Sequence, residues 1–150
     1  MKHDLSKIGI SLVILGLVGL TATALAVTRP FHLVEHGSLT VDKDGNLVAD
    51  GTGTATHLGR FSLHRTATLK PTTGGELEVD GQATLTAANG DQLEASINGP
   101  LNPQTGKAVL IYEWKGGTGR FQNANGTTVW LVQVNPDQTY DVVADGVINY

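Results

Sequence analysis

Apolar and polar residues alternate with a period of two along almost the whole chain after residue 30. No segment sustains the period of 3.6 that an amphipathic helix requires. The alternation therefore predicts eight β-strands. Their expected ranges are 31–41, 47–57, 61–70, 77–87, 91–98, 107–115, 127–134 and 139–150.

The segments between these strands carry the residues that tight turns prefer. DKDGN, PTTGGE, ANGD and NPDQ combine Gly, Asn, Asp and Pro over a few positions. Links this short join neighbouring strands as antiparallel hairpins. Only 116–126 is long enough for a helical turn, which we expect around Arg120, Phe121 and Gln122, with Phe121 plugging the barrel end.

Eight antiparallel strands joined in sequence favour an all-β fold, an eight-stranded closed antiparallel barrel formed by residues 27–150 as a single domain. Closure removes the edge strands through which a chain rich in Thr and Val would aggregate. A barrel of this size has room for packed side chains or for one small ligand. A β-sandwich is the alternative architecture.

The first 26 residues have a different pattern. Lys2 and Lys7 give the start of the chain positive charge. Residues 8–20 form an uninterrupted apolar run, and Ala24-Leu25-Ala26 is a small-x-small site. This order predicts a signal peptide over 1–26, a signal helix cleaved after Ala26, and hence a secreted, periplasmic or cell-envelope protein. The alternative is an uncleaved membrane anchor through 8–27, because about 20 apolar residues span a bilayer.

The stretch GTGTATHLGRF (51–61) contains glycines and threonines in strict alternation. Without a following Gly-Lys-Ser/Thr it is not a phosphate loop. Read as a strand, it directs Leu47, Ala49, Gly51, Gly53, Ala55 and His57 inward and its threonines outward. We expect the threonine face to be solvated, with an oligomer interface as the alternative.

Two charged residues fall on the inward face. If the turns pair Val41 with Leu47, His57 with Phe61 and Leu69 with Leu77, then Glu35, Gly53, Arg65 and Gly81 form one row across four strands. A buried charge needs a partner. Glu35 and Arg65 are therefore expected either as an internal ion pair that fixes the register or as the polar floor of a pocket for a carboxylate or carbonyl group.

Four large aromatic residues share the inward parity of the last three strands. They form either the bulky half of the core or an aromatic wall around an apolar ligand. His57 would lie at the barrel mouth. The residues predicted for a ligand site are Glu35, His57, Arg65, Tyr112, Trp114, Trp130 and Tyr140, and for a catalytic role Glu35 and Arg65.

Composition excludes several classes of function. The net charge is −4 and no basic cluster occurs, which argues against nucleic acid as a partner. The absence of Cys excludes disulfides, thiolate nucleophiles and Cys-ligated metals. His32 and His36 would lie roughly 13 Å apart on one strand, too far to share an ion, so we expect surface histidines, no metal and no cofactor.

GGTGRFQNANG (116–126), followed by a strand, resembles a glycine-rich stretch of plant dirigent proteins. With GTGTATHLGRF and TLTAANGDQL, the chain resembles bacterial secreted proteins related to the allene oxide cyclase barrel over about 31–150. This resemblance implies an eight-stranded barrel, often oligomeric, with an apolar cavity. Allene oxide cyclases close an epoxide fatty acid, and dirigent proteins steer phenoxy-radical coupling. The glutamate inside the cyclase barrel would correspond to Glu35, and the cyclase cysteine has no counterpart.

Three functions remain open at this point. The chain is a secreted barrel that binds a small apolar or amphipathic molecule or acts structurally. Alternatively, it is a cyclase- or isomerase-type enzyme that polarises a lipid-like substrate through Glu35 and Arg65. The third hypothesis is a packed structural or oligomerisation module. In each case we expect a homo-oligomer, either a dimer or a trimer.

Overall fold

The computed structural model describes residues 27–150. The predicted signal peptide, 1–26, and all but the last residue of the alternative anchor lie outside the described residues. Within residues 27–150, no helix has the length and apolar character needed to cross a membrane.

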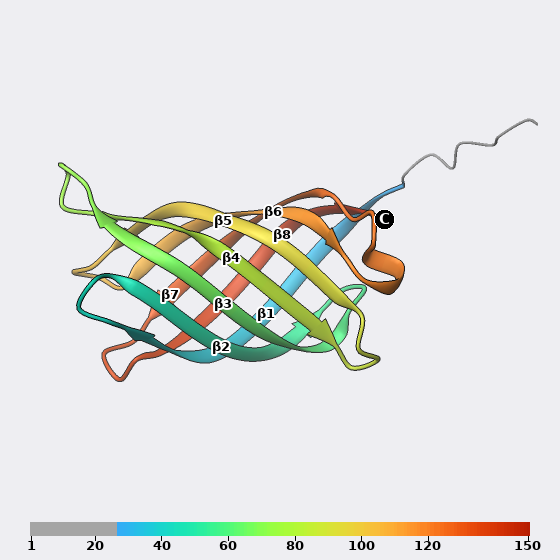
Figure 1. Ribbon diagram of the computed structural model, residues 1–150, viewed down its shortest axis with the longest axis horizontal. Coiled ribbons are helices and arrows are strands. Elements are labelled where there is room, and N and C mark those ends of the chain that lie inside the picture. The colour runs from blue at the N-terminus through green and yellow to red at the C-terminus, as the bar shows by residue number, and fades with distance from the viewer. Residues whose placement is uncertain (1–26) are drawn as a thin grey trace, which may run out of the picture.

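Eight antiparallel strands close into a barrel, in which each strand pairs with its sequence neighbours and the last pairs with the first (Figure 1). The prediction of an all-β closed barrel is confirmed, and the sandwich alternative is wrong. The strands are β1 (Thr28–Val41), β2 (Asn46–Ala55), β3 (Gly59–Pro71), β4 (Leu77–Ala87), β5 (Gln92–Asn102), β6 (Lys107–Gly117), β7 (Gly126–Val134) and β8 (Thr139–Asn149).

The period of two explains which side chains fill the barrel. On β8, Tyr140, Val142 and Ala144 are buried, whereas the residues between them are exposed. The same alternation runs along the other strands, so the single core lies inside the closed sheet.

The β1–β2 hairpin has the predicted register. The Asp42 carboxylate accepts hydrogen bonds from the backbone N–H groups of Asp44, at 2.8 Å, and Asn46, at 2.9 Å. Gly45 takes a left-handed φ of 83°, which a glycine adopts without steric cost. The turn therefore sets Val41 opposite Leu47, and two-residue steps along the strands bring Glu35 opposite Gly53.

The predicted register between β2 and β3 is wrong. Ala55 pairs with Gly59, so Gly53 lies opposite Phe61 instead of Arg65. The loop is tighter than expected because His57 and Gly59 both take left-handed φ angles, 72° and 69°.

The predicted register between β3 and β4 is also wrong, because Leu69 pairs with Val79 instead of Leu77. The predicted row of Glu35, Gly53, Arg65 and Gly81 therefore does not form. Arg65 lies between Ala49 on β2 and Ala83 on β4, and Gly81 pairs with Ala67. The sequence pattern could not distinguish these registers, because a shift by an even number of residues leaves every side chain on the same face.

A short 3₁₀ helix, η1 (Gly119–Phe121), covers the end of the barrel at which β1 begins and the chain ends (Figure 1). Phe121 is fully buried there, and its ring lies 5.1 Å from that of Tyr150. Leu58, in the β2–β3 turn, is also buried. The prediction that Phe121 plugs a barrel end is confirmed.

Candidate functional site

A cluster of buried polar and aromatic side chains occupies the interior of the barrel. We call it the buried polar cluster, and its members are Glu35 (β1), Arg65 (β3), Tyr112 (β6), Trp130 (β7) and Tyr140 (β8). Glu35 and Arg65 are only 2% and 4% exposed. The cluster thus contains five of the seven residues predicted for a ligand site.

The Glu35 carboxylate is bound from two sides. Arg65 Nη2 lies 3.4 Å from Glu35 Oε2, and the Tyr140 hydroxyl donates a short hydrogen bond of 2.5 Å to Glu35 Oε1. Arg65 reaches Glu35 even though the two residues are not in one row. Strand β2 lies between them, and its inward positions there are Ala49 and Gly51, which leave room for the long side chain.

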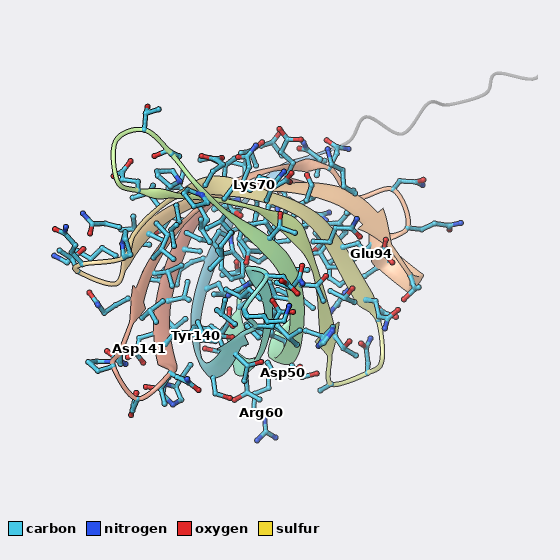
Figure 2. The ribbon with its side chains drawn as sticks, turned by 60° about the vertical axis from the view of Figure 1, so that its left-hand side comes forward. Asp50, Arg60, Lys70, Glu94, Tyr140 and Asp141 are labelled. Carbon is cyan, nitrogen blue, oxygen red and sulfur yellow. The ribbon has the colours of Figure 1, made fainter. Side chains whose placement is uncertain are left out.

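Two glycines provide the space for this arrangement. A Cβ added at Gly51 would collide with the Glu35 carboxylate and would lie 2.5 Å from the Tyr140 hydroxyl. A Cβ added at Gly37 would lie 2.5 Å from the same hydroxyl. The idea that glycine makes room for a long inward side chain is therefore correct, but the residues are Gly37 and Gly51. Figure 2 labels Tyr140 in its place on β8.

Aromatic rings surround the Arg65 guanidinium. Its central carbon lies 5.2 Å from the ring centroid of Tyr140 and 5.6 Å from those of Tyr112 and Trp130. Tyr112 and Trp130 stack almost parallel, at 3.8 Å and 6°. Cation–π contacts in a desolvated site contribute about 2 kcal/mol or more, so the rings help to hold the buried charge.

Burial dominates the electrostatics of the cluster. Desolvation raises the pKa of Glu35, because it outweighs the attraction of Arg65 and the hydrogen bond from Tyr140. Desolvation likewise raises the pKa of both tyrosines, Tyr112 and Tyr140. For Arg65, desolvation acts to lower the pKa, but the surrounding Tyr112, Glu35 and Tyr140 outweigh it, and Arg65 remains a cation.

His57 and Trp114 lie outside the buried polar cluster. His57 Nε2 lies 2.8 Å from the carbonyl oxygen of Pro30 at the plugged end of the barrel, with its ring 5.6 Å from that of Tyr150. Trp114 packs against Phe31 at 5.0 Å and reaches the cluster only through Tyr112, at 6.4 Å.

Thr128 was missed by the sequence analysis. It is 1% exposed, and its hydroxyl accepts a hydrogen bond of 2.7 Å from Trp130 Nε1. The alternation along β7 identifies it as an inward residue, because Thr128 shares the inward parity of Trp130. A polar residue at an inward position should have been assigned a buried partner.

Three buried polar atoms near the cluster have no hydrogen-bond partner among the described residues. They are Arg65 Nε, the Tyr112 hydroxyl oxygen and Trp114 Nε1. Unpaired buried donors are costly, about 1–3 kcal/mol each. The interior therefore retains unused capacity for hydrogen bonding.

Outside the barrel, three histidines each pair with an aspartate on a neighbouring strand. The distances are 2.7 Å for His32–Asp145, 2.9 Å for His36–Asp141 and 2.8 Å for His64–Asp50. All six side chains are more than half exposed. In residues 27–150, no group of three or more His, Asp or Glu side chains is placed to hold a metal ion.

A groove of about 1140 Å³ lies on the outer surface of the barrel. One of its walls is a row of side chains that runs across the strands from Ala88 through Val34 to Val109. The other wall runs from Thr86 through His36 to Lys107. Because the Glu35 side chain is fully buried, only its backbone contributes to the floor. The groove therefore does not open onto the buried polar cluster.

No model of a known protein family matches the chain. A search of curated proteins likewise finds no matching relative. The resemblance to the allene oxide cyclase and dirigent barrels thus stays a prediction.

Proposed function

We propose that this protein is a packed structural module that presents the outer surface of its barrel to partners and carries out no turnover. The observation that supports this function is the filling of the interior by its own side chains. Trp130, Tyr112 and Tyr140 are fully buried, and the first two stack face to face between the walls. An interior that is packed in this way leaves the outer face for interaction.

In this proposal Glu35 and Arg65 act as an internal brace. Their side chains are 0% and 5% exposed, so a substrate has no direct contact with either charge. A buried pair favours a register in which the two charges meet, because a register that separates them leaves an unpaired charge in the core.

A second function, binding of a small molecule with a carboxylate or carbonyl group, is supported by one observation. Arg65 Nε, the Tyr112 hydroxyl and Trp114 Nε1 lack protein partners within the described barrel. An amphipathic ligand that enters the core would accept hydrogen bonds from these donors. Such a ligand requires the aromatic side chains to move apart.

Native mass spectrometry of the protein purified from its natural host distinguishes the two functions. The packed module predicts a spectrum in which every peak corresponds to the bare polypeptide or to a multiple of it. A stoichiometric non-covalent adduct that persists under gentle ionisation would overturn the proposal in favour of ligand binding. Conversion of a bound molecule that stops in Glu35→Gln would instead establish an enzyme.

A further inference from the structure

The outer face of the barrel carries a continuous row of exposed apolar side chains. Val34 on β1 pairs with Val143 on β8, Val143 pairs with Leu131 on β7, and Leu131 pairs with Val109 on β6. Their exposed fractions lie between 44% and 56%. We call these four residues the apolar row. A contiguous exposed apolar patch on a soluble domain marks an interaction site.

Two further exposed valines, Val129 on β7 and Val147 on β8, lie on the same strands. The outer faces of β3, β4 and β5 have no large hydrophobic residue of comparable exposure in the described chain. The apolar surface is therefore concentrated on one side of the barrel.

Hydrogen-bonded His–Asp pairs flank the apolar row in an ordered way. On one side of the Val34–Val143 pair lies His36–Asp141, and on the other side lies His32–Asp145. Both histidines belong to β1 and both aspartates to β8. A column of histidines therefore runs beside a column of aspartates, with the apolar pair between them.

We propose that this face binds a second copy of the same chain, around a two-fold axis that runs parallel to the strands between β1 and β8. Such an axis places β1 of one copy over β8 of the other. Val34 then meets the partner's Val143, while His32 and His36 meet the partner's Asp145 and Asp141. The face is thus complementary to itself in hydrophobicity and in its His–Asp pairing, as an isologous dimer interface must be.

The shape of the surface is compatible with this packing. The groove described above runs along the apolar row and the neighbouring His36–Asp141 row, and it continues across β2, β3 and β4. Two sheets pack face to face about 10 Å apart with their strands nearly aligned, which is the arrangement that this axis produces. Arg60 on β3 and Lys107 on β6 line the groove on strands that are not next to the proposed axis.

This inference rests on the proposed function, because it names the partner that the outer surface takes. The first test is sedimentation of the intact protein across a range of concentrations, for the wild type, Val143→Glu and the matched control Val48→Glu. Val48 is exposed to a similar extent, 40%, but lies on β2 outside the apolar row. We expect a wild-type dimer, at least a tenfold weaker dimer for Val143→Glu, and no change for Val48→Glu.

A second pair of variants tests the charge pattern without altering the apolar row. His36→Asp places two carboxylates side by side on β1 and β8 and also opposes the partner's Asp141. His64→Asp creates the same repulsion within one chain, beside Asp50, but at β3, two strands away from the axis. We expect His36→Asp to weaken the dimer at least tenfold at low salt and His64→Asp to leave it intact.

The outcomes separate this inference from the proposed function. A wild-type protein that remains a monomer at about 100 μM, far above the micromolar range of a specific complex, overturns the dimer and leaves the packed module untouched. Equal weakening by Val143→Glu and Val48→Glu, or by His36→Asp and His64→Asp, also overturns it. A dimer that carries a stoichiometric small-molecule adduct retains this inference and overturns the proposed function.

Discussion

At the scale of the residue, the interior of this barrel is organised by two charges in an apolar space. An ion pair in a core gains little overall stability, since desolvation offsets the attraction. Removing one partner is costly, however, because the other charge stays buried and uncompensated. Glu35 has a second donor in Tyr140, while Arg65 has aromatic faces on several sides. The two charges therefore depend on each other to different degrees.

Arg65→Met tests this dependence. The substitution leaves Glu35 buried without its cation, and we expect a loss of about 3 kcal/mol and a melting temperature lower by roughly 10 °C. Arg60→Met, on the exposed face of the same strand, is the control and should change the melting temperature little. Circular dichroism melts measure both. Equal melting curves for wild type and Arg65→Met would show that the pair is not a brace.

Glu35 should also give the protein a characteristic dependence on pH. Because its pKa is raised in the folded state, folding favours the protonated carboxyl. Its contribution to stability is therefore fully present below the unfolded pKa and is lost as the pH rises through the folded pKa.

We expect the stability of wild type relative to Glu35→Gln to fall as the pH rises above the ordinary range of a carboxyl pKa, because the pKa of Glu35 is raised in the folded state. Urea unfolding at a series of pH values measures this difference, and Glu113→Gln on the exposed face of β6 serves as the control. A constant difference across the series would contradict the raised pKa.

At the scale of the element, β1 and β2 carry glycines at inward positions where the interior is crowded by other side chains. Gly37 and Gly51 pair with each other across the two strands. Glycine weakens an isolated strand, but here it admits the Tyr140 ring and the Glu35 carboxylate. The cost in local strand stability is offset by the packing that it permits.

Gly51→Ala should therefore be destabilising although alanine suits a strand better. The new Cβ meets the Glu35 carboxylate and the Tyr140 hydroxyl, and overpacking of this kind costs about 1–3 kcal/mol. Gly74→Ala, in the exposed β3–β4 turn, is the matched control, because a Cβ there contacts only the Thr72 hydroxyl at 3.9 Å. Denaturant unfolding compares the two. A Gly51→Ala protein as stable as wild type would show that the neighbouring side chains can shift to accommodate the added methyl group.

At the scale of the whole molecule, closure requires the first and last strands to meet. Thr28 pairs with Asn149, and the β1–β8 ladder extends to Ser38–Thr139. Contacts between residues this far apart in the chain carry a large loop-closure entropy, which slows folding. The barrel can therefore complete its core only when the chain ends come together.

We expect refolding in milliseconds to seconds, as for other β proteins dominated by non-local pairing. Trp114 and Trp130 are both buried, so their fluorescence reports the closure of the core. Stopped-flow dilution from urea measures the rate. A microsecond phase that recovers all of the native tryptophan signal would contradict the dependence on β1–β8 pairing.

The sequence by itself determined the elements and their faces. Alternation with a period of two assigned Glu35, Arg65, Tyr112, Trp130 and Tyr140 to the interior, because a side chain on a strand has only two directions available. Turn residues located the hairpins, and in the β1–β2 turn they also determined the register.

Only the tertiary structure decided which inward residues meet. The His57–Phe61 register and the observed one bury the same side chains, so the hydrophobic pattern could not choose between them. The left-handed turn at His57 and Gly59 accompanies the observed register. The contacts inside the barrel join strands far apart in the chain: Arg65 on β3 reaches Glu35 on β1, and Tyr140 on β8 reaches the same carboxylate. The apolar row on the outer face likewise arises from residues of four strands, which become neighbours only when the barrel closes.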